Sequence, residues 1–263
     1  MDLNVKGKVF MVAAASKGLG YGIAEALAQD GATVCIGSRT KADIEQAAQA
    51  LADQTGSEVM GSVFDARDKA SIDAWTAEVV AKYGRIDGLV VNAGGPPAGK
   101  FDNFDDADWQ AAFELTLMST VRMIRAVLPT MRAQKSGAIL TVTSSSIKEP
   151  IDIILLSNVL RSGVVSLVKS LSTDIISDGI RINNLVPGRM DTDRVESLDK
   201  TVAGRLGISY EESRANAEAK IPSGRYGTIQ EFGKMGAFLL SDAASYITGT
   251  TVTVDGGAMK TVW

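Results

Sequence analysis

The sequence contains no histidine among its 263 residues, and this absence excludes more chemistry than any other feature of its composition. It removes Ser-His-Asp catalysis, histidine general bases and histidine metal ligands together. Because the chain also has a single cysteine, we predict no metal site. Any acid–base step must therefore use lysine, tyrosine, a carboxylate or the substrate itself.

The lone cysteine, Cys35, stands inside the apolar run ATVCIG, so no internal disulfide can form. We interpret it as a buried core residue in a protein of a reducing compartment. No apolar run approaches the roughly 18 residues that a membrane span requires, and MDLNVKGKVF lacks the regions of a signal peptide. We therefore expect a cytoplasmic protein without a membrane partner.

The charge balance is mildly acidic, with a net charge of −4 and no long run of like charges or basic stripe. This pattern argues against nucleic acid or an anionic membrane as a main partner. The hydrophobic content of 45% is enough to form one sizeable core. We predict one domain over residues 1–263 that binds a small molecule.

Apolar runs of strand length alternate with helical segments along the chain. The strand-like runs lie at residues 8–14, 32–37, 58–64, 85–91, 137–143, 179–187 and 251–254. Strands separated in this way indicate parallel βαβ crossovers. The pattern predicts an α/β fold, a doubly wound and mostly parallel sheet of seven strands with helices on both faces.

One polar segment, residues 189–220, interrupts this rhythm between a strand and the last helix. It is rich in Glu, Arg and Ala and is helix-prone. Because an insertion at the carboxyl end of a strand lies where a lid would cover a site, we predict a substrate lid. A helical excursion on the surface is the alternative.

A glycine loop follows the first strand and opens directly into a helix. Its glycines, Gly18 and Gly20, permit a tight turn and a close approach of backbone to ligand, while free N–H groups at the helix start favour a phosphate. At the end of the second strand, an NAD-binding protein would carry an acidic residue, but this chain has Ser38 and Arg39. Arg39 and Lys17 offer two cations for a 2′-phosphate, so we predict NADP(H) rather than NAD(H).

A second polar cluster follows the fifth strand. Ser144 comes directly after that strand, and Ser157 and Arg161 lie four residues apart on the following helix, so they share one face. If the strand end and the helix face converge, these three side chains meet at one reaction site.

These motifs resemble those of the short-chain dehydrogenase/reductase family over nearly the whole chain. The matching features are the AAASKGLG loop at residues 13–20, Asp65, Asn92-Ala93-Gly94, Ser144, Pro187-Gly188, Thr192 and the IPSGRYG, SYITG and VDGG segments. The resemblance implies a Rossmann fold, a nicotinamide cofactor, and homodimers or homotetramers built on two long helices.

The resemblance and the glycine loop together give the expected cofactor contacts. Asp65 is expected beside the adenine, Thr192 at the nicotinamide carboxamide and Arg161 beside the ribose. The full predicted set is Ala14, Ser16, Lys17, Gly18, Leu19, Gly20, Ser38, Arg39, Asp65, Asn92, Ala93, Gly94, Arg161, Pro187, Gly188 and Thr192.

The catalytic positions depart from the family pattern. Where the family has asparagine, serine, tyrosine and lysine, this chain has Thr116, Ser144, Ser157 and Arg161. A serine hydroxyl is far less acidic than a phenol of pKa about 10, and arginine, with a pKa above about 12, cannot relay protons but can stabilise an anion. The chain is more similar to an atypical subgroup of the family than to its standard members. This subgroup is 3-oxoacyl carrier-protein reductase-like and lacks the Tyr-x-x-x-Lys motif.

Four hypotheses follow from this departure. A carbonyl or activated alkene could be reduced with Arg161 and Ser144 holding the oxyanion, or another acid, namely Lys148, Asp152 or Tyr210, could donate the proton. The chain could instead bind NADP(H) without turnover, or act as a non-redox lyase or dehalogenase-like enzyme.

Two further arginines, Arg189 and Arg194, lie near the expected cofactor end of the pocket. They would suit an acidic or acyl substrate. Pairing with Asp191, Asp193 or Glu196 on the lid surface is the alternative.

Overall fold

The computed structural model describes residues 2–262, so residues 1 and 263 of the predicted domain lie outside the described part. Seven strands form one sheet in the order β3-β2-β1-β4-β5-β6-β7, and all neighbours are parallel. The strands are β1 (Val9–Ala13), β2 (Thr33–Ser38), β3 (Val59–Val63), β4 (Gly88–Val91), β5 (Gly137–Val142), β6 (Ile180–Pro187) and β7 (Thr251–Val254). The predicted doubly wound α/β sheet is confirmed.

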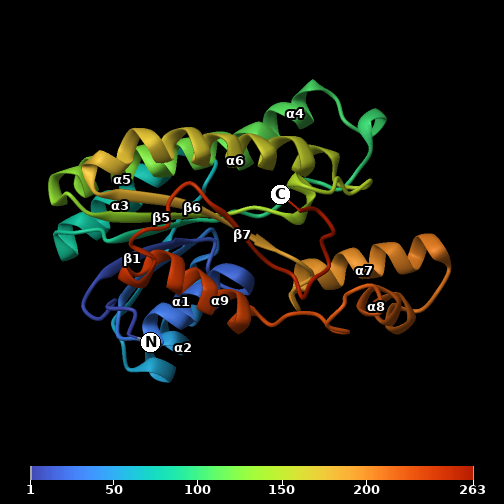
Figure 1. Cartoon of the computed structure of the whole chain (residues 1–263), viewed down its shortest axis with the longest axis horizontal. Helices are drawn as coiled ribbons and strands as arrows, with labels where there is room; N and C mark the ends of the chain where they lie inside the picture. The colour runs from blue at the N-terminus through green and yellow to red at the C-terminus, as the bar shows by residue number, and fades with distance from the viewer. Residues whose placement is uncertain (1, 263) are drawn as a thin grey trace.

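Helices cover both faces of the sheet (Figure 1). They are α1 (Gly18–Gln29), α2 (Lys41–Thr55), α3 (Lys69–Tyr83), α4 (Asp106–Phe113), α5 (Ser119–Gln134), α6 (Leu155–Ile175), α7 (Asp193–Leu206), α8 (Tyr210–Glu218) and α9 (Ile229–Leu240). The helices α1, α2 and α9 contribute to one buried apolar cluster, and α3, α5 and α6 contribute to the other. The sheet therefore separates two hydrophobic cores.

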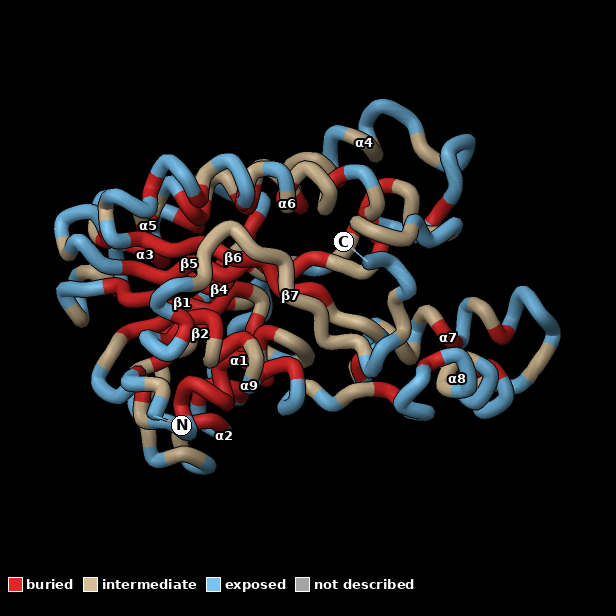
Figure 2. The backbone as a smooth tube through the Cα atoms, in the orientation of Figure 1, coloured by how far each residue is buried: buried red, intermediate tan, exposed pale blue. Residues whose placement is uncertain are grey.

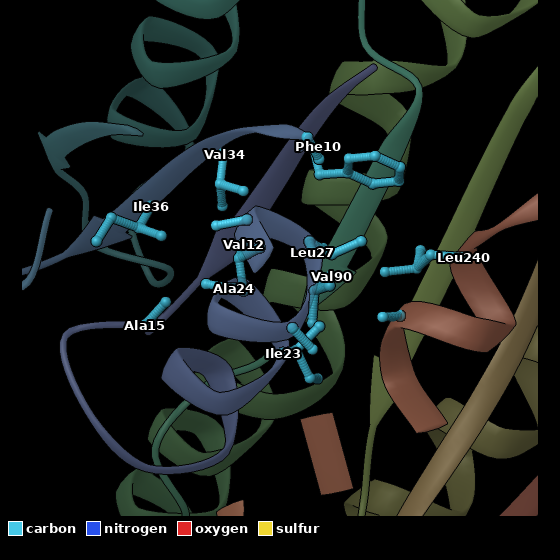
Figure 3. Packing of buried hydrophobic residues seen from close by; sticks show 14 of the residues in the cluster. Phe10, Val12, Ala15, Ile23, Ala24, Leu27, Val34, Ile36, Val90 and Leu240 are labelled. Atoms are coloured by element: carbon cyan, nitrogen blue, oxygen red, sulfur yellow. The ribbon is translucent and has the colours of Figure 1, made fainter. Parts of the chain in front are cut away.

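The central strands are buried on both faces, as continuous apolar runs in a parallel sheet require. In Figure 2 the backbone of these strands is coloured as buried. In Figure 3, Val12 of β1 and Val90 of β4 lie near Leu27 and Ile23 of α1, and Val34 of β2 belongs to the same cluster. This packing holds the start of α1 at the carboxyl edge of the sheet.

A close contact between α1 and α9 fixes that helix further. A Cβ atom added at Gly233 would lie 2.0 Å from the backbone oxygen of Gly22, so no side chain fits there. The two backbones therefore approach each other directly, and α1 has little freedom to shift relative to the sheet.

The predicted helical segment from residue 105 to 134 contains a feature that its sequence pattern did not indicate. Between α4 and α5, residues Glu114–Met118 form a π-helical turn, η2. This turn carries Thr116, whose side chain is buried. π-helical turns are rare and frequently occur at functional sites.

The polar segment 189–220 folds into α7 and α8. These helices project from the carboxyl side of the sheet (Figure 1). None of the helices between residues 2 and 262 has the length and hydropathy needed to span a bilayer.

Ala14, directly after β1, has a φ angle of +50°, a conformation that favours glycine. We predict that Ala14→Gly raises the free energy of unfolding by about 0.5–1 kcal/mol. An L-residue in the left-handed region costs about 1–2 kcal/mol, and glycine relieves this cost. Glycine also has more conformational freedom in the unfolded chain, which offsets about 0.5–1 kcal/mol of that stabilisation. Urea denaturation checks this. The control is Ala50→Gly, on the exposed face of α2, which should instead lose about 0.5–1 kcal/mol; a similar loss at Ala14 contradicts the prediction.

Candidate active site

The carboxyl ends of four neighbouring strands open into one cavity of about 870 Å³. Because these strands are parallel, the loops that follow them meet at the same edge of the sheet. The loops that line the cavity include residues Ala14 and 17–19 after β1, 92–95 after β4, 142–145 at the end of β5 and 187–194 from the end of β6. Ser157 and Arg161 of α6 also line it. The glycine loop and the three predicted reactive side chains therefore share one cavity.

Arg161 is fixed against the end of β5 by several hydrogen bonds. Its Nε donates to Ser157 Oγ at 3.0 Å, and its Nη1 donates to the backbone oxygens of Val142 at 2.9 Å and Thr143 at 3.4 Å. Burial, and secondarily the positive charge of Arg194, lower the pKa of Arg161 to about 10. The guanidinium therefore remains a cation at neutral pH.

Ser144 is the N-cap of a short 3₁₀ turn, η3 (Ser145–Ile147), where its Oγ accepts a hydrogen bond from Ser146 N at 3.2 Å. Because both this bond and the bond of Ser157 Oγ to Arg161 use the serine oxygen as acceptor, each hydroxyl proton stays available to the cavity. The structure brings Ser144, Ser157 and Arg161 together, as their spacing predicted.

Thr116 lies behind this cavity and does not line it. It shares with Arg161 a separate void of about 10 Å³, about the size needed for one water molecule. Its Oγ1 is buried and has no hydrogen-bond partner among residues 2–262. Thr116 therefore lines a small void next to the cavity and not the cavity itself.

The three candidate replacement acids, Lys148, Asp152 and Tyr210, do not line the cavity. The loop after β5 contributes Ser144, Ser145 and Glu149 to the wall, and Lys148 follows the end of η3 outside that wall. Tyr210 begins α8, where its hydroxyl accepts a hydrogen bond from Arg214 at 3.4 Å. The geometry therefore disfavours Lys148, Asp152 and Tyr210 as proton donors.

The start of α1 fits an anionic group. The N-cap residue, Lys17, leaves the first backbone N–H groups of the helix without a side-chain cap, and Gly18 and Leu19 line the cavity. The buried Ser38 Oγ at the end of β2 has no partner among the described residues, and Arg39 beside it is exposed. These donors match the phosphate groups of a nucleotide.

Gly20 has a structural role in this arrangement. A Cβ atom there would lie 2.6 Å from the Ala14 oxygen and 3.0 Å from Asn92 Nδ2. Asn92 in turn donates to the Ala14 oxygen at 3.3 Å, which ties the loop after β4 to the glycine loop.

Other predicted cofactor residues lie outside the cavity wall. These are Ser16 and Gly20 of the glycine loop, Ser38 and Arg39 at the end of β2, and Asp65 after β3. The Arg67 side chain donates two hydrogen bonds, of 3.1 and 2.7 Å, to the Asp65 carboxylate, and these bonds are the main reason that the pKa of Asp65 is lowered. The predicted residues Ala93, Gly94, Pro187, Gly188 and Thr192 all line the cavity.

Lys17 differs from the prediction in its partner. Its Nζ lies 2.5 Å from an oxygen of Asp193 at the start of α7, so this ion pair links the glycine loop to the predicted lid. The lysine charge is therefore already paired with a carboxylate.

The sequence interpretation missed the residues that anchor the predicted lid. Asp199 of α7 is almost fully buried, forms an ion pair with Arg189 and accepts a hydrogen bond from Tyr226 Oη at 2.7 Å. It also missed the apolar face of α7, formed by Val195, Leu198, Val202 and Leu206, all of which line the cavity. Their helical spacing in an otherwise polar segment is a signal that could have identified this face.

Among residues 2–262, no acidic or cysteine side chains gather in a group that could bind a metal.

Comparison with known proteins identifies the family. The family model described as enoyl-(acyl carrier protein) reductase matches residues 13–259. The 3-oxoacyl-(acyl-carrier-protein) reductase FabG of Escherichia coli (strain K12) is 34% identical over 262 residues, which cover 97% of this chain and 98% of that protein. The chain belongs to the short-chain dehydrogenase/reductase family. The resemblance to this family drawn from the motifs is thus confirmed.

Solved structures agree with this family's fold. The L-sorbose reductase from Gluconobacter frateurii, complexed with NADPH and L-sorbose, matches all of both chains with a TM-score of 0.95 and 30% identity. The NADPH-bound short chain oxidoreductase from Pseudomonas aeruginosa PAO1, described as containing an atypical catalytic center, has a TM-score of 0.88 and 27% identity. That match covers 97% of this chain and 98% of the other.

Proposed function

We propose that this chain is an NADP(H)-dependent oxidoreductase that reduces a carbonyl or an activated alkene at a non-standard active site formed by Ser144, Ser157 and Arg161. The observation that carries this proposal is the single cavity that joins the glycine loop to the fixed guanidinium of Arg161. The predictions of an oxidoreductase and of NADP as cofactor are supported by the relatives, which include NADPH-bound reductases.

The residues of the site divide the work between binding and charge stabilisation. Bound NADPH supplies a hydride, and the chain must stabilise the negative charge that develops on the substrate oxygen. Arg161 Nη2 has no hydrogen-bond partner among residues 2–262, whereas Nε and Nη1 are held by Ser157 and the end of β5. Arg161 therefore offers a preorganised cation, and the Ser144 hydroxyl donates a hydrogen bond to the same oxygen.

This arrangement suits acceptors that need little proton donation during reduction. At a pKa of about 10, Arg161 holds its proton at neutral pH, so it acts by its charge. Ser157 keeps the guanidinium in place through its hydrogen bond to Nε. This division of roles supports assignment to the atypical subgroup without the tyrosine and lysine, as does the similarity to the P. aeruginosa oxidoreductase.

The cofactor would lie along the edge from β2 to β6. Gly18, Leu19, Asn92 and Thr192 would contact its nicotinamide half, and the exposed Arg39 would bind the 2′-phosphate. Lys17 could join Arg39 only by leaving Asp193. In this proposal the segment 189–220 is the substrate lid, because α7 presents its apolar face to the cavity.

The test begins with binding and continues with turnover. A fluorescence titration with NADPH and then with NADH should show tighter binding of NADPH, and Arg39→Gln should reduce that difference by about tenfold or more. NADPH oxidation should then be measured with ketones, enones, quinones and imines, and we expect the fastest turnover with acceptors that need little proton donation.

Two results would contradict the proposal in different ways. Absence of NADPH binding rules out the cofactor assignment. NADPH binding without turnover of any acceptor class instead identifies a cofactor-binding protein without redox activity. The predicted homodimer or homotetramer and the cytoplasmic location stay predictions.

A further inference from the structure

The arginines near the cavity differ in whether a carboxylate already neutralises them. Arg189 forms an ion pair with the buried carboxylate of Asp199 and hydrogen-bonds to the Tyr226 hydroxyl at 3.2 Å. Arg189 therefore holds α7 in place. Arg194, which also lines the cavity and is exposed, has no carboxylate at ion-pair distance within residues 2–262.

The acidic residues around Arg194 in the sequence have other partners. Asp193 pairs with Lys17, Asp191 accepts two hydrogen bonds of 3.0 and 3.1 Å from Arg214, and Glu196 pairs with Lys200 at 2.6 Å. The alternative that Arg194 pairs with one of these carboxylates on the lid surface is therefore wrong.

Arg194 contacts the loop after β4 only weakly. Its Nη2 lies 3.4 Å from the backbone oxygen of Pro96. It also lies close to Gly95, because a Cβ atom added there would be 3.2 Å from Nη2. Most of the five donors of this guanidinium are thus free to bind a ligand.

Two further acidic residues in the cavity wall, Glu149 and Asp255, accept hydrogen bonds from the C-terminal backbone. Glu149 accepts from Lys260 N at 2.8 Å, and Asp255 accepts from Gly257 N at 3.0 Å and Met259 N at 2.8 Å. These carboxylates are used within the fold, and Arg194 forms an ion pair with neither of them.

An apolar surface lies beside this cation. The residues that form it are Val195, Leu198, Val202 and Leu206 of α7, with Ile151, Ile153, Ile154, Met190 and Met259. Leu198 lies four residues after Arg194 on α7, so these two side chains share one face of the helix, and both line the cavity. A ligand that satisfies both has an apolar chain and an anionic group.

We propose that Arg194 is a substrate-specificity residue that binds the carboxylate of a substrate with an apolar chain. A guanidinium can donate two parallel N–H bonds to a carboxylate, which fixes both position and orientation. Arg161 is then left to face the reacting oxygen, so the two arginines have separate roles. This inference rests on the proposed function, since both arginines line the same cavity.

The experiment uses octanoate and octanamide, which have the same chain and differ in the charge of the head group. Binding of each to the full-length protein is measured by calorimetry, with and without saturating NADP⁺, so that no turnover occurs. We expect octanoate to bind about tenfold or more tightly than octanamide. This preference should vanish in Arg194→Gln and persist in part in Arg194→Lys.

The matched control is Lys220→Gln, which removes another cavity cation that has no ion-pair partner within residues 2–262. Its octanoate preference should equal that of the unaltered chain. Three outcomes would overturn the proposal: equal binding of the two ligands, loss of the preference in Lys220→Gln alone, or weaker NADP⁺ binding in Arg194→Gln with the preference intact. If NADP⁺ fails to bind at all, the proposed function fails, while the measurements without cofactor still decide the role of Arg194.

Discussion

Arg161→Gln should lower kcat for NADPH oxidation by about 10²- to 10³-fold with whichever acceptor the unaltered chain reduces. The substitution removes the cation that we place at the reacting oxygen, while the amide nitrogen, which stands where Nε stood, can still donate to Ser157 Oγ. Arg161→Lys keeps a charge but not the three hydrogen bonds, so it should retain part of the activity. Steady-state kinetics following NADPH absorbance measure both variants.

The pH dependence of the same reaction gives an independent check of this role. Because the pKa of Arg161 is lowered to about 10, the cation is present below that pH and is lost as pH rises through it. Turnover that depends on the cation should therefore fall as the pH approaches 10. Arg161→Gln has no such group, so its residual activity should lack this fall.

Two comparisons make the prediction specific to Arg161. Arg125→Gln, at an exposed position of α5, should leave kcat unchanged. Ser157→Ala removes only the partner of Nε and should lower kcat by roughly tenfold or less. Abolished turnover in Ser157→Ala together with full activity in Arg161→Gln would exchange the roles that we assign to these residues.

The parts of this molecule that the sequence predicts are those governed by local pattern. Apolar runs such as that of β1 have no polar face, so they predict buried parallel strands. The meeting of Ser144 with Ser157 and Arg161 follows from the four-residue helical spacing and the parallel topology. The side chains that share the cavity can therefore be predicted before the structure is known.

The parts that the sequence does not predict depend on contacts between distant residues. Lys17 looks like a free phosphate-binding cation, but it is paired with Asp193, which lies 176 positions further along the chain. In the same way, Arg189 and Arg194 are alike in sequence, and only the structure shows that the buried Asp199 pairs with Arg189. The π-helical turn at Thr116 interrupts a helical pattern that shows no break.

Asp199→Ala should lower the free energy of unfolding by about 3 kcal/mol, the lower end of the range for removing one partner of a buried ion pair. Asp199 has a relative exposure of 1%, and its carboxylate accepts hydrogen bonds from both Arg189 and Tyr226. The variant leaves these donors unmatched beneath α7. The lower end applies because the Arg189 side chain is 42% exposed, so water can solvate part of its charge.

Urea denaturation measures the global loss, and hydrogen exchange shows where it arises. We expect the backbone amides of α7 and α8 to exchange faster while those of β5 and β6 change least, because Asp199 anchors the segment that projects from the sheet. Asp193→Ala is the matched control: it removes an exposed carboxylate of the same helix and should cost at most about 1 kcal/mol. Tyr226→Phe, which removes one hydrogen bond to Asp199, should cost about 1 kcal/mol. Equal losses in Asp199→Ala and Asp193→Ala would mean that the buried ion pair does not anchor α7.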